Sequence, residues 1–374
     1  MEPARIGPAL CLPRLVFGAG SLAQLDAELA LLGVGRALLV TDRGLDRAGV
    51  AATVGSASTR IAAQFLDVPE NPTAAGADTA MAVYRDNRCD GVVALGGGSV
   101  LDTAKIVAAL AASELDGAAD LIGKPERLPA KCAPLVAIPT TIGTGSESSP
   151  VSSMHLVAGG PGFGTRGPQM VPSVALCDPE LTRSLPVRLI AATGIDALSH
   201  CVEGFFSEPA NPIIDALALD GAARVFADIH AACEANGDSA RGSIMAAAFA
   251  GGAAIHKGLG PAHAVALACG DQHAHHGTLI GVALPHTTRL LARALPAKAA
   301  RLAKAIGLPP EADLADALGE LIASLGMPNQ LGATGYVMGD ENAVVAALNS
   351  SPFNRTTPYV PTDAEYRAVL TAIG

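Results

Sequence analysis

The chain has 374 residues, a length that suits two domains of ordinary size. Half of its residues are apolar and only 16% are charged, so the composition indicates a large buried core and excludes a largely disordered chain. The formal net charge is −10 and no cluster of Lys and Arg forms a basic stripe, which argues against a nucleic-acid partner.

The cysteines and the apolar stretches bear on the compartment. Seven Cys are scattered without a CxxC pair, which is typical of a reducing compartment and no disulfide framework. The N-terminus lacks the long apolar region of a signal peptide, and the most apolar stretches, such as residues 106–112, are too short to cross a bilayer. We therefore expect a cytoplasmic protein with no membrane partner.

The first half of the chain alternates strand-like apolar runs with helical runs. Strands are expected at Arg36–Asp42, Ile61–Val68, Gly91–Leu95, Pro134–Pro139 and Val171–Asp178. Helices are expected at Thr73–Arg88 and Leu101–Ser113, and the glycine-rich Ala158–Gly167 is expected to form a flexible loop or hairpin. This alternation predicts a parallel sheet covered by helices on both faces.

Helical patterns replace the strands after about residue 180. Helices are expected at Val187–Phe206, Pro212–Asn236, Ser239–Ile255, Pro261–Ala268, Leu279–Leu295, Pro296–Gly307, Asp313–Gly326, Asp340–Leu348 and Asp363–Ile373. The predicted fold class is therefore an α/β N-terminal domain over residues 1–182 followed by an all-α domain over residues 183–374. The boundary is expected near Pro179–Pro186.

A glycine turn, Gly96-Gly97-Gly98-Ser99, closes a predicted strand and opens a predicted helix. Glycines let backbone N–H groups approach a ligand, and the start of a helix favours an anion. The turn therefore predicts a pyrophosphate site, with Ser99 as a helix cap or a donor to phosphate and with Asp102 on the first helical turns. A tight turn without a ligand is the alternative.

A second polar turn strengthens the nucleotide hypothesis. The segment Ile138–Glu147 also follows a strand and offers the hydroxyl groups of Thr140, Thr141, Thr144 and Ser146. Because the carboxyl ends of parallel strands line the ligand crevice, two such turns favour a nucleotide. Asp42 ends an earlier strand, where a carboxylate can accept from a ribose hydroxyl and repel a 2′-phosphate, which favours NAD over NADP. A helix-capping role for Asp42 is the alternative.

Histidines gather in the second half of the chain. Asp196 and His200 are four residues apart on a predicted helix, so both project from one face. Downstream stand His263, His273, His275 and His276. On one unbroken helix His263 and His276 would lie about 220° apart, but Gly270 offers a break that can return both imidazoles to the first pair. Three neutral imidazoles and one carboxylate suit Zn²⁺ or Fe²⁺; exposed helix-end histidines without a metal are the alternative.

Five motifs lie between Gly96 and Gly277. They are GGGSxxDxxK (Gly96–Lys105), PTTxGTxSE (Pro139–Glu147), GxDAxxHxxE (Gly194–Glu203), GLGxxHA (Gly258–Ala264) and HHG (His275–Gly277). In combination they resemble the iron-containing, or group III, alcohol dehydrogenases. The resemblance implies a dinucleotide-binding α/β domain and a helical domain with the site between them, assembled as homodimers or larger oligomers. It implies a metal- and NAD(P)-dependent enzyme that interconverts a small alcohol with its aldehyde or ketone.

The resemblance also implies roles for individual residues. It implies metal ligation by Asp196, His200, His263 and His276. It implies that the residues holding NAD(P) are Asp42, Gly97, Gly98, Ser99, Asp102, Thr140, Thr141 and Thr144, with Asn71 contacting cofactor or substrate.

The chain departs from the family at one position that bears on proton transfer. Many members carry a relay His four residues after the third ligand, and this position is Leu267 here. His273 or His275 is a candidate to take over the relay, with exposure to solvent as the alternative for both. Lys257 is a candidate to hold an acidic group of the substrate, with a solvated helix-end Lys as the alternative.

Two further hypotheses stay open at this point. A glycerol-dehydrogenase-like or maleylacetate-reductase-like oxidoreductase is the first; His200 argues against the one and the full set of four candidate ligands against the other. A metal- and nucleotide-binding homologue with impaired catalysis is the second, because Leu267 removes an expected relay group.

Overall fold

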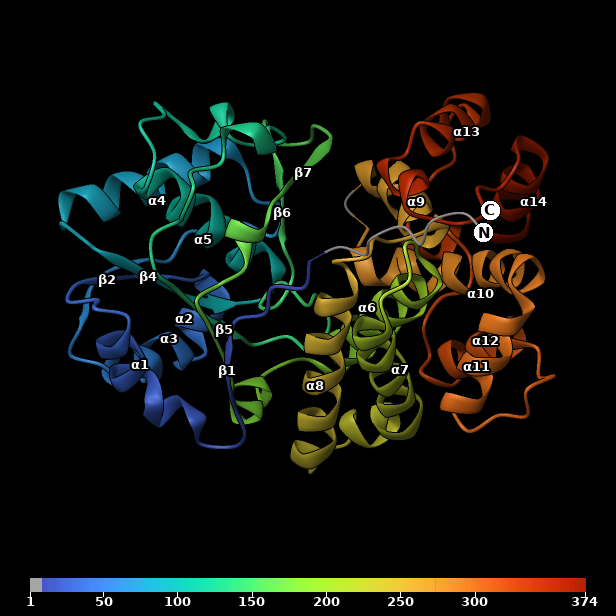
Figure 1. Ribbon diagram of the computed structural model, residues 1–374, viewed down its shortest axis with the longest axis horizontal. Coiled ribbons are helices and arrows are strands. Elements are labelled where there is room, and N and C mark those ends of the chain that lie inside the picture. The colour runs from blue at the N-terminus through green and yellow to red at the C-terminus, as the bar shows by residue number, and fades with distance from the viewer. Residues whose placement is uncertain (1–8, 273) are drawn as a thin grey trace. The chain divides into compact units, whose positions relative to one another are not determined.

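The computed structural model describes residues 9–272 and 274–374, and within them the chain forms two compact units (Figure 1). One unit is Cys11–Leu185; the other is Pro186–Gly374 together with residues 9 and 10. The predicted class, a parallel sheet followed by a helical region, is confirmed. The candidate His273 lies outside the described residues.

The first unit is built on a six-stranded parallel sheet with the strand order β1-β8-β5-β4-β2-β3. Its strands are β1 (Arg14–Phe17), β2 (Ala37–Val40), β3 (Ile61–Phe65), β4 (Gly91–Gly96), β5 (Leu135–Pro139) and β8 (Val174–Cys177). A separate antiparallel hairpin is formed by β6 (Val151–His155) and β7 (Gly162–Arg166), so the hairpin alternative for the glycine-rich segment is correct. No sequence signal predicted the edge strand β1, whose residues are largely exposed.

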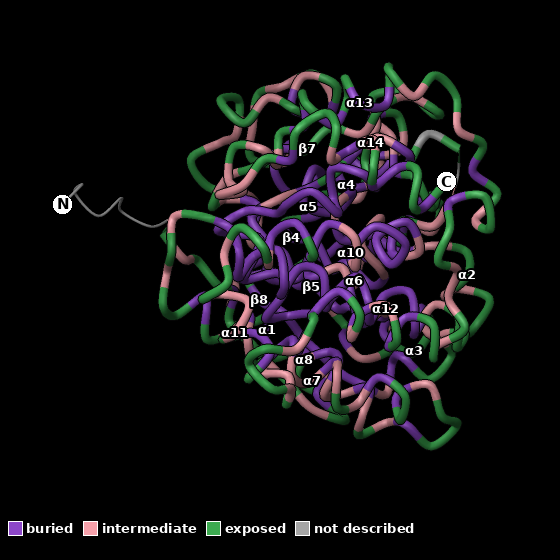
Figure 2. Tube along the Cα trace, turned by 90° about the vertical axis from the view of Figure 1, so that its right-hand side faces the viewer, coloured by how far each residue is buried: buried purple, intermediate pink, exposed green. Residues whose placement is uncertain are grey.

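Helices cover both faces of this sheet, as the alternation of the sequence predicts. Leu38 on β2 packs into the core beneath α4 (Ala74–Asp86) and α5 (Gly98–Ala111). The next residue, Leu39, packs into the opposite core with α1 (Leu25–Leu31) and α3 (Val50–Ser56), and the short α2 (Arg43–Arg47) precedes α3. Figure 2 accordingly shows β4, β5 and α5 buried. Burial on both faces explains why β4 is apolar along its whole length.

The chain reverses direction within the sheet between β2 and β4. From β2 it crosses to β3 by α3 on one face, returns to β4 by α4 on the other face, and continues to β5 by α5. The neighbouring strands β2 and β4 therefore feed helices on opposite faces. In an open parallel sheet this arrangement leaves a ligand crevice beyond the carboxyl ends of the two strands.

The second unit is helical throughout its regular structure. Its α-helices are α6 (Val187–Phe206), α7 (Pro212–Ala232), α8 (Asp238–Ala254), α9 (Pro261–Ala268), α10 (His276–Ala294), α11 (Pro296–Ala305), α12 (Leu314–Ser324), α13 (Glu341–Asn349) and α14 (Asp363–Ile373). Proline stands at the first position of α7, α9 and α11, where its missing N–H costs no hydrogen bond. These prolines explain why the predicted starts of the three helices are correct.

The helix α6 is the core of this unit and packs against α7, α8 and α10. Glycines permit close approach, since a Cβ on Gly251 of α8 would lie 2.9 Å from His200 Cβ. Among the described residues α6 is the one helix long and apolar enough to cross a membrane, and it is longer than the apolar stretches singled out in the sequence. Its most apolar part is 94% buried inside the fold. Its apolar character is therefore accounted for by core packing.

Candidate functional site

The four side chains predicted to bind a metal converge in the helical unit. His200 Nε2 lies 3.8 Å from Asp196 Oδ1, one turn earlier on α6. His263 Nε2 on α9 lies 4.0 Å from the same oxygen, and His276 Nε2 at the start of α10 lies 3.7 Å from it. The helix is interrupted between α9 and α10, as Gly270 predicted. The ring centroids of His263 and His276 are 5.4 Å apart. Imidazoles from three helices thus surround one carboxylate.

Two atoms of this cluster have unmet bonding capacity. Asp196 Oδ1 and His263 Nε2 are buried, and neither has a hydrogen-bond partner among the described residues. Burial raises the pKa of Asp196, which the neighbouring His276 and His263 lower in part. A buried carboxylate and a buried imidazole lone pair are costly without a partner, and a cation satisfies both. Asp196, His263 and His276 offer ligand atoms within 4.8 Å of one another, so the donor set fits a divalent metal.

Glu203 is a residue to which the sequence assigned no role. Its Oε2 contacts His263 Nδ1 at 2.5 Å and accepts from the Gly260 amide at 3.1 Å, while its Oε1 accepts from the Ala262 amide at 2.6 Å. A signal was present in the sequence, because Glu203 follows His200 by three positions and therefore lies on the same helical face. The carboxylate joins α6 to the start of α9.

Two further candidates stand beside this cluster. His275 is the residue before α10, and its Nδ1 is buried without a hydrogen-bond partner among the described residues. Leu267 lies one turn after His263 on α9 and is 44% exposed. A titratable group is thus available from the α9–α10 connection, whereas α9 itself presents an apolar side chain at the relay position.

The structure corrects the prediction for Lys257. Its side chain is fully buried, and its ammonium donates to Asp215 Oδ1 at 2.5 Å and to the Phe205 carbonyl at 3.1 Å. Burial lowers the pKa of Lys257, and the hydrogen bond to Asp215 opposes that shift. Neither the substrate-binding role nor the solvated alternative fits, because the ammonium is enclosed and paired with a carboxylate 42 positions away.

In the first unit the glycine turn takes the predicted form. β4 ends at Gly96, Gly97 is the N-cap residue, and α5 begins at Gly98, so Ser99 does not cap the helix. A Cβ on Gly97 would lie 3.0 Å from Thr141 Cγ2, and one on Gly98 would lie 3.0 Å from Thr144 Cγ2. The two predicted loops therefore touch, and a Cβ at either glycine would require the threonine opposite to move by a few tenths of an ångström.

The loop after β5 supplies donors next to this turn. The Thr140 amide donates to the Gly96 carbonyl at 3.1 Å, which joins the ends of β4 and β5. Thr141 Oγ1 is buried and has no hydrogen-bond partner among the described residues. An unpartnered hydroxyl beside a glycine turn and a helix start fits an anionic ligand such as a phosphate.

Asp42 and Asn71 follow the two neighbouring strands β2 and β3. Asp42 Oδ1 accepts from the Gly44 amide at 2.7 Å and from the Leu45 amide at 3.0 Å, so it caps α2. Within the described residues Oδ2 makes no hydrogen bond, which leaves one carboxylate oxygen for a ligand. Asn71 is exposed. The capping alternative for Asp42 is therefore observed, and it is compatible with cofactor binding.

Asp102 and Lys105 hold the surrounding loops in place. Asp102 Oδ1 accepts from Ser146 Oγ at 2.6 Å, and Oδ2 accepts from the Ser153 amide at 2.7 Å. Lys105 Nζ donates to the carbonyls of Ser149 and Val151 at 3.0 and 2.7 Å. Because both oxygens of Asp102 bond within the protein, its geometry indicates a role in positioning the second polar turn, not direct contact with cofactor.

Glu147, at the end of this turn, gives the unit a pH-dependent stability. Burial raises its pKa from 4.5 to about 7, and its Oε1 is unpartnered among the described residues. A carboxyl with a raised folded-state pKa stabilises the fold below its unfolded pKa, and this stability is lost as pH rises through about 7. We expect Glu147→Gln to be more stable than wild type above neutral pH, by at most about 3 kcal/mol, with the difference vanishing near pH 4.5. Thermal unfolding across this pH range measures it.

A matched control for this prediction is Glu114→Gln, which changes an exposed carboxyl in the same unit. This variant controls for the loss of one negative charge from the unit. A Glu147→Gln difference that does not change with pH would show that Glu147 is not the buried titrating group.

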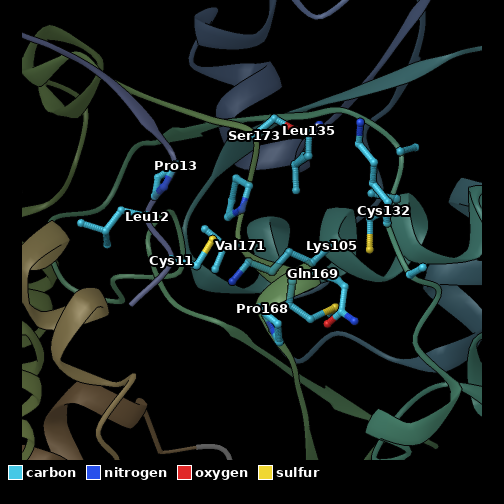
Figure 3. A pocket seen from close by; sticks show the side chains of 16 residues that line it. Cys11, Leu12, Pro13, Lys105, Cys132, Leu135, Pro168, Gln169, Val171 and Ser173 are labelled. Carbon is cyan, nitrogen blue, oxygen red and sulfur yellow. Dashed lines mark hydrogen bonds between the residues drawn. The ribbon is translucent and has the colours of Figure 1, made fainter. Parts of the chain in front are cut away.

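A pocket of about 450 Å³ lies at the amino ends of the strands β5 and β8, away from the carboxyl ends that carry the two polar turns (Figure 3). Leu135 at the start of β5 and Ser173 just before β8 line it, together with Cys11, Cys132 and Lys105. None of the cofactor candidates lines this pocket. The nucleotide hypothesis therefore rests on the carboxyl edge of the sheet.

A parallel-sheet unit with a glycine turn, and a helical unit with a carboxylate surrounded by imidazoles, indicate an enzyme that binds a nucleotide and a metal. Two family profiles match the chain: iron-containing alcohol dehydrogenase over residues 13–179, and the C-terminal part of the Fe-containing alcohol dehydrogenase family over residues 190–373. The chain belongs to the iron-containing alcohol dehydrogenase family, whose members are oxidoreductases.

Named relatives match over nearly their whole length. The 4-hydroxybutyrate dehydrogenase of Cupriavidus necator is 39% identical over 370 residues, which cover 95% of this chain and 96% of the relative. Among solved structures, a 1,3-propanediol oxidoreductase matches with a TM-score of 0.90 at 29% identity, covering 99% and 100% of the two chains. A sulfoacetaldehyde reductase from Bifidobacterium kashiwanohense in complex with NAD⁺ matches with a TM-score of 0.89 at 28% identity, covering 98% of each.

Proposed function

We propose that this protein is an NAD- and metal-dependent dehydrogenase that interconverts a small alcohol and its aldehyde. The proposed substrate carries an acidic group at the end opposite the reacting carbon. One observation carries the proposal above the others. The unpartnered Asp196 Oδ1 and His263 Nε2 face one another from two helices, with His200 and His276 beside them. Two buried polar atoms without hydrogen-bond partners are costly for the fold unless a cation satisfies them.

The proposed ligands are Asp196, His200, His263 and His276, and Fe²⁺ or Zn²⁺ suits them. When bound, the metal supplies a Lewis acid for the substrate oxygen, and the nicotinamide accepts or delivers the hydride. The chain's own contribution begins with orientation. Asp196 and the three imidazoles would hold the cation from three helices; Asp196, His200 and His263 are buried, and the His276 side chain is 53% exposed.

The residues at the carboxyl edge of the sheet are proposed to bind NAD. The backbone N–H groups of Gly97, Gly98 and Ser99 are suited to a pyrophosphate at the start of α5. Thr141 Oγ1 is an available donor, and Asp102 holds the loop that carries Thr144. The free Oδ2 of Asp42 is proposed to accept from a ribose hydroxyl, and the exposed Asn71 adds a polar contact.

The relatives support a substrate with an acidic end. The 39%-identical relative is named for 4-hydroxybutyrate, which carries a carboxylate, and another is named for sulfoacetaldehyde, which carries a sulfonate. His275 is proposed to accept or return the proton of the alcohol, since its Nδ1 has no partner in the described residues. We also propose a homodimer or larger homo-oligomer and a cytoplasmic location, which the family resemblance and the scattered cysteines support.

The proposed role of Asp42 predicts the choice of cofactor. Asp42→Ser removes the charge that would repel a 2′-phosphate, while serine remains a good helix N-cap. We expect the preference for NADH over NADPH to fall roughly tenfold or more, equivalent to about 1.4 kcal/mol. The measurement is kcat/KM with each cofactor. Asp340→Ser, which alters the N-cap of α13 in the other unit, is the control and should leave the ratio unchanged.

One experiment tests the function as a whole. The protein is purified anaerobically, its metal content is measured, and oxidation of NADH and NADPH is followed with a panel of small aldehydes with and without acidic groups. The proposal expects about one Fe or Zn ion per chain, with kcat/KM highest for acid-bearing aldehydes. Absence of metal and of turnover across the panel would leave a nucleotide-binding homologue without this chemistry. Turnover of neutral aldehydes alone would refute the acidic substrate class.

A further inference from the structure

We propose that Glu203 is a positioning residue that selects the tautomer of His263 and turns its Nε2 toward Asp196. The inference rests on the proposed metal-dependent function. Glu203 is 1% exposed and His263 is 3% exposed, so solvent does not compete for their contact. Their ring nitrogen and carboxylate oxygen are 2.5 Å apart.

The hydrogen bonds around Glu203 assign the proton in this contact. Oε1 accepts from the Ala262 amide and Oε2 accepts from the Gly260 amide, and backbone N–H groups act only as donors. With each oxygen already accepting from a backbone N–H group, the surroundings favour the ionised carboxylate, which has no proton to donate, so the proton shared with His263 belongs on Nδ1. A neutral imidazole with Nδ1 protonated carries its lone pair on Nε2.

The other side of the ring is consistent with this assignment. His263 Nε2 has no hydrogen-bond partner among the described residues and lies 4.0 Å from Asp196 Oδ1. A lone pair there suits a cation, whereas an N–H would aim a proton at the same position. Carboxylates that bind the outer nitrogen of a ligand imidazole fix its orientation and raise its basicity.

Glu203 also balances the charge of the cluster. A dication beside Asp196 and three neutral imidazoles would leave a net charge of +1, and the Glu203 carboxylate behind His263 brings the sum to zero. Its bonds to Gly260 and Ala262 fix the start of α9 and hence the direction of the ring. The Glu203 side chain thus fixes both the start of α9 and the tautomer of His263.

The test compares Glu203→Gln with wild type in the full-length protein. Glutamine keeps the size of the side chain, but its NH₂ group must face either His263 or a backbone N–H donor. Each protein is freed of metal, and the affinity for Zn²⁺ and Co²⁺ is measured by competition with a chromogenic chelator. We expect affinity to fall by about 10–100-fold and the Co²⁺ absorption spectrum to change. Glu28→Gln, a buried carboxyl in the other unit, is the control and should bind metal as wild type does.

The outcomes separate this inference from the proposed function. Wild type that binds neither metal would refute the function. Wild-type affinity and spectrum in a folded Glu203→Gln would refute the positioning role alone. If Glu203→Gln does not fold, ¹⁵N-histidine NMR of the wild-type protein decides the question, with His263→Ala used for assignment. A neutral His263 protonated on Nδ1 is expected, and protonation on Nε2 in the metal-free protein would overturn the inference.

Discussion

Replacing His263 with alanine is expected to abolish both metal binding and turnover. The side chain is 3% exposed, and its Nε2 is one of the three imidazole nitrogens around Asp196 Oδ1. Because loss of an outer-sphere partner typically costs about 10–100-fold in metal affinity, loss of a ligand should exceed 100-fold. Metal content after dialysis and kcat/KM with the best substrate measure the two effects.

A readout that does not depend on activity accompanies this prediction. A ligand that binds only the folded state stabilises it by about 2.7 kcal/mol at a concentration one hundred times its Kd. Added Zn²⁺ should therefore raise the Tm of metal-free wild type and leave the Tm of His263→Ala unchanged. His230→Ala, which removes an exposed imidazole on α7, is the control and should respond as wild type does. Equal metal-dependent stabilisation of all three proteins would contradict the proposed ligand set.

Much of the fold follows from local sequence signals. β4 was predictable because a continuous apolar run is followed directly by glycines, although α5 begins at Gly98, three residues before the predicted start at Leu101. The starts of α7, α9 and α11 were predictable because proline marks their first residue. The edge strand β1 was not, since it is short, largely exposed and has no clear alternation. The short helices α1 to α3 were also missed, because seven residues or fewer span less than two full turns.

The candidate site was predictable only where it is local. Asp196 and His200 are neighbours by helical geometry, and the break near Gly270 allowed His263 and His276 to meet. The roles of other side chains depend on distant partners. Glu203 bonds to a ring sixty positions away, and Asp102 bonds to Ser146 across 44 positions. Residue spacing carries no information about such pairs, because they are created by tertiary packing.

Lys257→Met is expected to destabilise the helical unit strongly. The change would leave the Asp215 carboxylate, which is 7% exposed, without its counter-ion. Breaking a buried ion pair from one side typically costs about 3–5 kcal/mol. At about 2–4 °C per kcal/mol for a domain of this size, the fall in Tm should be on the order of 10 °C. Thermal and urea unfolding measure it.

Two variants show whether the loss of stability in Lys257→Met comes from the unpaired charge of Asp215. Lys257→Met combined with Asp215→Leu should recover most of the stability, because an apolar pair of similar volume often replaces a buried ion pair without loss. The Phe205 carbonyl keeps a donor in that variant, since Lys298 Nζ also bonds to it at 3.2 Å. Arg224→Met breaks the exposed pair with Asp220 on α7 and should cost no more than about 1 kcal/mol.

The same measurements distinguish the structural role of Lys257 from the substrate-binding role that its position in the sequence suggested. A lysine that binds the acidic end of the substrate would raise KM for acid-bearing aldehydes alone and leave the unfolding free energy unchanged. A lysine that neutralises Asp215 beneath α6 would lower the unfolding free energy and affect all substrates alike, because α6 carries both Asp196 and His200. The enclosure of the ammonium between Asp215 and the Phe205 carbonyl favours the second outcome, since a group without solvent access cannot exchange its partner for a substrate.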